Sequence, residues 1–175
     1  ILQADRLIER QALSQSAVDQ VYAHQRNFLG VVGRSSTLFL VNGNHEHADL
    51  ALLDGTENNA AVLAGRARTR FYPLPAPDGF YTGNREEVKF VGVPRDYYAW
   101  QWGDALFVVL DPYWYSRATR GGSEPWNMTL GKRQYDWLAT CLRRSSARFK
   151  FVFIHQLVGG LGANGRGGAE AVPLY

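Results

Sequence analysis

Three stretches carry apolar side chains at helical spacing, with charged and amide side chains between them: residues 5–29, 50–70 and 130–144. This periodicity predicts three amphipathic helices. Gly30 follows the first stretch and is a plausible terminator for it. Prolines at 73, 75 and 77 then predict an irregular segment that extends to about residue 95.

Four short apolar runs, rich in aromatic and β-branched residues, predict β-strands: 37–41, 97–102, 105–110 and 149–154. Gly103-Asp104 between the second and third runs predicts a hairpin turn. Strands that alternate with helices predict an α/β fold. In such folds the carboxyl ends of parallel strands meet at one edge of the sheet, where binding sites are usually found.

Polar side chains follow two of these predicted strands. The strand over 37–41 runs into Gly43-Asn44-His45-Glu46, and His155 directly follows the strand over 149–154. Neighbouring side chains in extended or turn geometry point in opposite directions, so Asn44 could face a metal while His45 faces a substrate. Each feature has a simpler interpretation: a turn with a capping Asn and a surface His, and a hydrogen-bonded core histidine at 155.

The string Gly43-Asn44-His45-Glu46 resembles the calcineurin-like metallophosphoesterases, whose Gly-Asn-His-(Asp/Glu) motif it matches at all four positions. The helix carrying Gln134 and Trp137-Leu138 also resembles that family, as does the strand before His155. The resemblance implies an α/β sandwich of two mixed sheets flanked by helices. It implies that Asn44 and His155 bind the same metal ion and that the catalytic His45 sits over the phosphoryl group.

The same resemblance implies a hydrolase that cleaves phosphate mono- or diesters by attack of a metal-bridging hydroxide. Its cofactors would be two divalent ions, drawn from Mn, Fe, Zn and Mg. The family's Asp-x-His, Gly-Asp-x-x-Asp and Gly-His-x-His motifs do not occur in these 175 residues. Residues 1–175 are therefore expected to be the central portion of a single metallophosphoesterase domain, incomplete at both ends and inactive in isolation, with the metal site completed by ligands outside them.

Further polar residues near the motif allow more than one interpretation. Glu46 and His47 are expected to orient or border the site, and Asp111, although it ends a strand, is expected to be structural. The Gly-rich stretch 159–168 lacks the Gly-Lys-Ser/Thr of a phosphate-binding P-loop. It is either a connector or a loop beside the site, in which case Arg166 would bind substrate phosphate.

Composition narrows the function classes. The chain is 46% hydrophobic and 20% charged with a net charge of +3, typical of one globular domain. No block of Lys and Arg indicates a nucleic-acid tail, and no apolar run reaches the length of a membrane span. A single cysteine, Cys141, excludes an intrachain disulfide and a thiolate zinc site. The sequence does not indicate a compartment.

Two other functions remain compatible with the sequence. One is a non-catalytic, aromatic-rich module that binds carbohydrate or protein. Its sign would be exposed tryptophans, for which the candidates are Trp100, Trp102, Trp114 and Trp126. The other is a degenerate family member retained as a scaffold.

Overall fold

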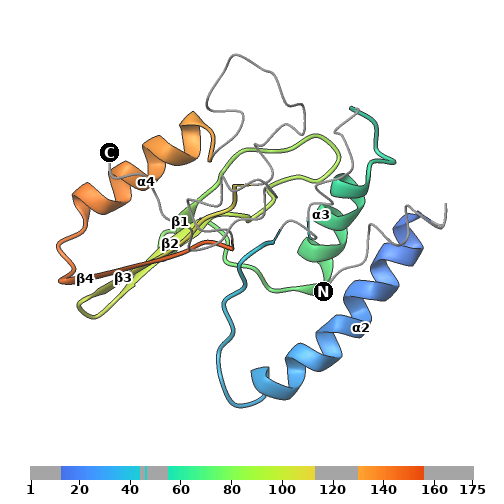
Figure 1. Ribbon diagram of the computed structural model, residues 1–175, viewed down its shortest axis with the longest axis horizontal. Coiled ribbons are helices and arrows are strands. Elements are labelled where there is room, and N and C mark those ends of the chain that lie inside the picture. The colour runs from blue at the N-terminus through green and yellow to red at the C-terminus, as the bar shows by residue number, and fades with distance from the viewer. Residues whose placement is uncertain (1–12, 44–45, 47–54, 113–129, 156–175) are drawn as a thin grey trace, which may run out of the picture.

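The computed structural model describes residues 13–43, 46, 55–112 and 130–155. These residues form a pair of helices, α2 (Gln15–Gly33) and α3 (Ala60–Phe71), beside a four-stranded mixed sheet. Helix α4 (Lys132–Arg144) lies on one face of that sheet (Figure 1). The described part of the chain is therefore mixed α/β, in agreement with the fold class predicted from the sequence. No helix in this part is long and apolar enough to cross a lipid bilayer.

Helix α2 spans Gln15–Gly33 and begins at Ser14, whose hydroxyl accepts a hydrogen bond from the Ala17 backbone N–H at 3.2 Å. The prediction that Gly30 ends this helix is wrong, because the helix continues for three more residues. A glycine ends a helix when it adopts a left-handed conformation, and Gly30 does not adopt one. Instead its carbonyl accepts the Arg34 N–H at 3.1 Å.

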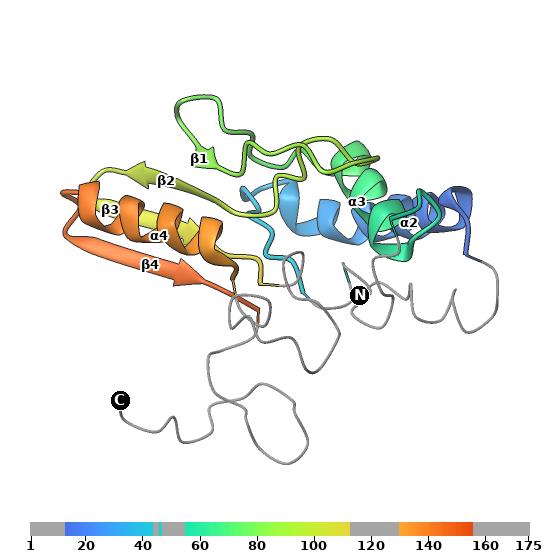
Figure 2. The same ribbon diagram turned by 90° about the horizontal axis from the view of Figure 1, so that it is seen from above.

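Helix α3 spans Ala60–Phe71 and is shorter than the predicted 50–70 helix, since residues 55–59 form turns. The side chain of Asn59 caps it by accepting the Ala61 N–H at 2.9 Å. Small residues on α3 let the backbones of the two helices approach closely, and the rings of Tyr22 and Tyr72 pack at 5.5 Å between them. This core is separate from the sheet in sequence but adjacent to it in space (Figure 2).

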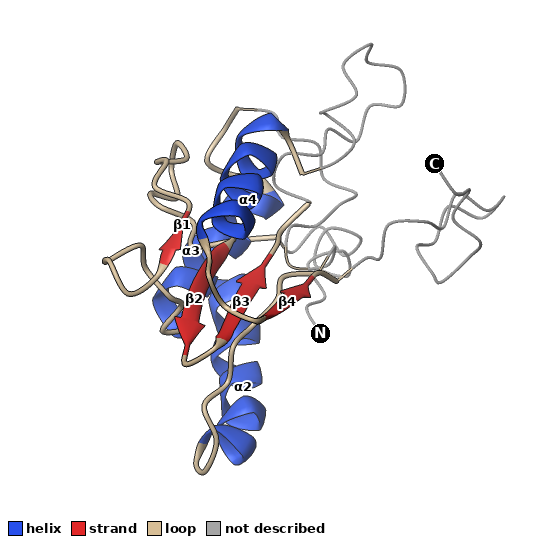
Figure 3. Cartoon of the chain, turned by 90° about the vertical axis from the view of Figure 1, so that its left-hand side faces the viewer, coloured by secondary structure: helices blue, strands red, loops and turns tan. Residues whose placement is uncertain are grey.

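The sheet has the order β1-β2-β3-β4, formed by Thr82–Gly83, Tyr98–Trp102, Ala105–Val109 and Phe149–Phe153. The β2–β3 pair is the predicted hairpin, and its antiparallel register pairs Trp100 with Phe107. The last strand, β4, pairs in parallel with β3, so both strands end at the same edge (Figure 3). The sequence predicts that the strands over 37–41 and 149–154 share an edge, whereas the structure pairs β4 in parallel with β3.

The prediction of a strand over 37–41 is wrong. Residues 37–43 are extended, but they belong to no strand of the sheet. Their side chains pack on a face of the sheet instead: Phe39 stacks on Trp100 with ring centroids 4.0 Å apart, and Val41 joins the same cluster. The Tyr98 hydroxyl donates to the Leu40 carbonyl at 2.9 Å and holds the segment there. The apolar side chains at Phe39 and Val41 therefore reflect packing against the sheet, not pairing within it.

The two faces of the sheet are covered differently. Helix α4, Lys132–Arg144, packs its apolar side over Leu106 and Val108. On the opposite face the rings of Trp100, Phe107 and Phe151 stack in succession, with centroids 5.0 and 5.4 Å apart. Phe151 at the edge is 46% exposed. The aromatic face is thus buried at β2 and open at β4.

Candidate functional site

The shared edge of β3 and β4 brings polar groups together. Beyond the last paired residues, the Leu110 N–H donates to the Phe153 carbonyl at 2.9 Å, so the segments that leave β3 and β4 stay side by side. Asp111 lies two residues beyond β3, and His155 lies two residues beyond β4. Asp111 is fully buried, and His155 is exposed.

The segment that leads into the Gly-Asn-His-Glu motif arrives at the same edge. The side-chain amide of Asn42 donates to the Asp111 carboxylate at 2.8 Å, and both residues are buried. The bond joins positions 69 residues apart in sequence. It therefore fixes where the motif begins relative to the end of β3.

Gly43, the first residue of the motif, lies against the imidazole of His155. A Cβ atom at Gly43 would come within 3.1 Å of the His155 Cε1 atom and 3.2 Å of its Nδ1 atom. Ordinary side-chain contacts are longer than this, so only glycine fits without displacing the ring. Gly43 and His155, more than a hundred residues apart in sequence, meet at this edge.

Glu46 closes a turn over the motif. Its carboxylate accepts the Gly43 N–H at 2.7 Å, and its own N–H donates to the Gly43 carbonyl at 3.1 Å. These two bonds tie Glu46 to Gly43, the residues that flank positions 44 and 45 in the sequence. The expectation that Glu46 orients the motif agrees with these bonds.

Gln134 of α4 fixes the end of β3 from the other side. Its Oε1 atom accepts the Asp111 N–H at 2.9 Å, and its Nε2 atom donates to the Asp111 carbonyl at 2.7 Å. The side chain is fully buried. The sequence assigned only packing to Gln134, whereas the structure gives it the backbone hydrogen bonds that another strand would otherwise supply.

Acidic and basic groups surround the motif turn on the α2–α3 side. Burial raises the pKa of Tyr72 to about 12, and the charge of Glu46 adds to the increase. Burial also raises the pKa of Tyr22 far above its usual value; the positive charge of Arg68 opposes that increase and Glu46 reinforces it. Arg68 is itself buried. Tyr22 and Tyr72 thus both lie within electrostatic range of the Glu46 carboxylate, and Arg68 lies within range of Tyr22.

Several residues singled out in the sequence fall outside the described part. Asn44, His45 and Arg166 do so, as does His47, and their positions are not assigned. His155 is described, at the edge where the sequence places a metal ligand. The described residues contain no group of three or more His, Cys, Asp or Glu side chains able to hold a metal ion.

The tryptophans show a mixed outcome. Trp102 is 73% exposed, as the binding-module alternative requires. Trp100 is buried because Phe39 covers it. Trp114 and Trp126 lie outside the described residues. The sequence pattern does not single out Asn42. Its only signal is its position between the apolar run over 37–41 and Gly43.

Comparisons with known proteins give no independent assignment. No family model matches the sequence, and no match was found among curated proteins or solved structures. The functional argument therefore depends on the residues themselves.

Proposed function

We propose that the chain is the central portion of a calcineurin-like metallophosphoesterase domain, which hydrolyses phosphate mono- or diesters with two divalent metal ions. The observation that carries the proposal is the contact between Gly43 and the His155 imidazole. Gly43 precedes Asn44 directly in the sequence, which supports the proposal that Asn44 and His155 share a metal ion. The α/β sandwich of two sheets is part of the same proposal.

The donor types suit the proposed metals. An amide oxygen from Asn44 and an imidazole nitrogen from His155 are compatible with Mn, Fe or Zn. Two donors do not saturate one ion, which needs four to six ligands. Carboxylate and imidazole donors from outside this chain are therefore part of the proposal, and the 175 residues alone are expected to bind metal weakly.

When bound, the metal ions would supply Lewis acidity to the phosphoryl oxygens and to a water molecule. His45 would donate a proton to the leaving-group oxygen as the ester bond breaks. This role is supported by the bonds between Gly43 and Glu46, which flank Asn44-His45 in the sequence, and by the position of Gly43 against the His155 ring. Arg166 is proposed, more weakly, as a ligand of the substrate phosphate.

The test uses the longer protein that supplies the missing motifs. His155→Ala and Asn44→Ala should reduce bound metal, measured by elemental analysis of the purified protein, together with the hydrolysis rate. His24→Ala, a change at an exposed histidine on α2, is the matched control and should leave both unchanged. Full metal content in His155→Ala would contradict the metal role.

His45 has a separate test. Loss of a general acid typically costs about 10²–10⁴-fold in rate. The loss should be largest for alkyl phosphate esters, whose leaving groups need the proton, and smallest for nitrophenyl esters, which leave readily without it. If His45→Ala lowered the hydrolysis rate equally for both substrates, the general-acid role would be contradicted, while the metal assignment would be unaffected.

A second candidate, a non-catalytic binding module, is favoured by one observation. The sheet carries two exposed rings: Trp102 of β2, 73% exposed, and Phe151 of β4, 46% exposed, at the open end of the ring stack. Exposed rings of this kind suit stacking against sugars or bases. Saturable binding of an oligosaccharide that Trp102→Ala abolishes, with no metal-dependent hydrolysis in the longer protein, would favour this function.

A further inference from the structure

A groove lies away from the motif turn, between the C-terminal half of α2, the extended segment 36–40 and the irregular segment 71–81. Its volume is about 720 Å³. Pockets for small organic ligands range from about 300 to 1,000 Å³. The groove is thus large enough for such a ligand, and nothing in the proposed phosphoesterase reaction uses it.

The floor of the groove is apolar, and each of the three bordering segments contributes side chains to it. It includes Leu29 of α2, Phe39 of the extended segment, and Phe71, Leu74 and Tyr81 beyond α3. Leu74 is buried, and the other four are partly buried. A ligand with an apolar body would remove this surface from water, which drives binding.

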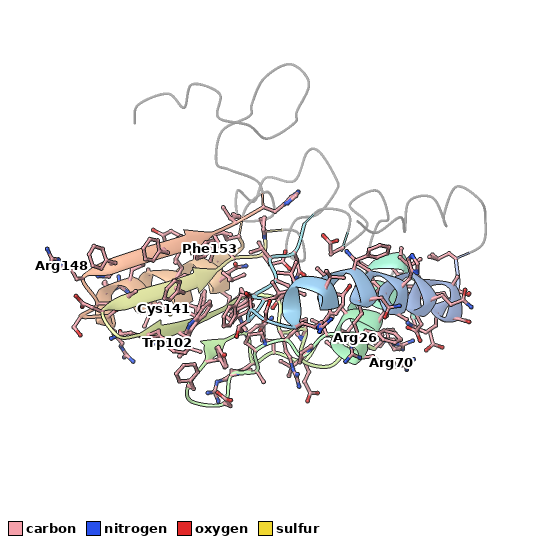
Figure 4. All side chains as sticks on the ribbon, turned by 90° about the horizontal axis from the view of Figure 1, so that it is seen from below. Arg26, Arg70, Trp102, Cys141, Arg148 and Phe153 are labelled. Carbon is pink, nitrogen blue, oxygen red and sulfur yellow. The ribbon has the colours of Figure 1, made fainter. Side chains whose placement is uncertain are left out.

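The rim of the groove is positively charged. Arg26 and Arg34 line it two helical turns apart, and both are exposed. Neither forms an ion pair with any residue in the described ranges. Asp78, a carboxylate on the opposite wall, uses its Oδ1 atom to accept the Phe80 and Tyr81 N–H groups at 3.1 and 3.0 Å. Figure 4 shows Arg26 on α2.

We propose that this groove binds a small amphipathic anion, that is, a carboxylate, sulfonate or phosphate head on an apolar body. The body would lie on the Phe39–Leu74 floor, and the head would pair with the guanidinium of Arg26 or Arg34. Guanidinium groups form charge-assisted, often bidentate hydrogen bonds with such heads. The site does not depend on the phosphoesterase assignment, because no metal or motif residue lines it.

Gly30 gives a direct way to close the groove. It lines the groove on α2, and a Cβ placed there would meet nothing within 4 Å. Position 30 thus has open space for a Cβ atom at the wall of the groove, and a large side chain there is expected to occupy the groove. Gly30→Phe fills the site, and Gly30→Ala is the matched control that changes the helix backbone equally but leaves the groove open.

The experiment titrates the 175-residue chain with decanoate and, in parallel, with decyltrimethylammonium, which has a similar body and the opposite charge. Calorimetry should show saturable one-to-one binding of decanoate and at least tenfold weaker binding of the cation. Gly30→Phe should abolish decanoate binding and Gly30→Ala should retain it, with matching circular dichroism spectra. Arg26→Gln/Arg34→Gln should weaken binding about tenfold. Arg143→Gln/Arg144→Gln, which removes the same charge from α4, should change it less than threefold.

The proposal is overturned if decanoate does not saturate, if the cation binds as well as the anion, or if Gly30→Phe folds and binds normally. Should Gly30→Phe not fold, the comparison of the two double arginine variants decides, and equal affinities for the two would also overturn it. None of these outcomes depends on hydrolysis or metal content, so failure here is distinct from failure of the phosphoesterase proposal.

Discussion

Asp111 and His155 end neighbouring parallel strands at one edge of the sheet, yet their surroundings differ completely. Asp111 is fully buried: its carboxylate accepts from Asn42, and Gln134 binds both of its backbone groups. His155 is exposed, and its ring edge faces Gly43. Both residues are of a type that binds metals, and sequence position alone does not separate them.

The difference teaches that burial, more than residue type, distinguishes a structural group at a strand end from one that a ligand can reach. The Asp111 carboxylate lies in a buried network with the Asn42 amide, whereas the His155 imidazole is exposed to solvent. The following changes test this contrast, from the largest expected effect to the smallest.

Gln134→Leu should have the largest effect, lowering the free energy of unfolding by about 4 kcal/mol, because it removes two side-chain hydrogen bonds to the buried Asp111 N–H and carbonyl. Leucine has nearly the same volume, so packing is retained. Urea unfolding followed by circular dichroism measures the change. Arg143→Ala, at an exposed position on the same helix, is the control and should cost less than about 0.5 kcal/mol. Equal losses for the two would contradict the role of Gln134.

The Asn42–Asp111 bond should come next. A double-mutant cycle with Asn42→Ala and Asp111→Ala should give a coupling energy of about 2 kcal/mol, since the bond is buried and one partner is charged. The cycle removes the separate costs of each truncation. A coupling energy below about 0.5 kcal/mol would mean that the motif segment is held at this edge by something else.

Gly43→Ala should cost about 1–2 kcal/mol, because the new Cβ lies within 2.9 Å of the Glu46 carboxylate and 3.1 Å of the His155 ring. Part of this cost should disappear when His155→Ala is added. Gly30→Ala is the matched control: nothing lies near its Cβ, and it should stabilise α2 by about 0.5–1 kcal/mol. Strictly additive effects of Gly43→Ala and His155→Ala on the melting temperature would argue against their contact.

His155→Ala alone should change stability least, by no more than about 0.5 kcal/mol, because the side chain is exposed. Thermal unfolding of the 175-residue chain measures it. A loss comparable to that of Gln134→Leu would erase the contrast between the two strand ends and make His155 a structural residue.

The sequence predicted much of the sheet and α4, because the aromatic hairpin and the run before His155 have strong local patterns. It erred at Gly30, where helix continuation depends on the backbone conformation, and over residues 37–41. An apolar run of this kind is compatible both with a paired strand and with a segment packed on a sheet face. Its position was decided by distant partners, chiefly Trp100 and Tyr98, which no local pattern reveals.

At the candidate site, Gly43 lies against His155, although the strand over 37–41 from which the sequence predicts this meeting does not form. The sequence did not reveal that Asn42 and Gln134 meet at Asp111. Such a network joins three segments remote in the chain, and each member alone resembles an ordinary polar residue. The placement of Asn44, His45 and Arg166 stays a prediction.

Strand β4 has a consequence for the behaviour of the chain in solution. All five of its residues are exposed, and among the described strands none covers its outer edge. Phe149, Phe151 and Phe153 alternate with a single charge at Lys150. An uncovered edge of this composition is a template for intermolecular β-augmentation. The isolated chain should accordingly stay monodisperse only when dilute, and a second charge at Val152 is the change that would raise its solubility limit.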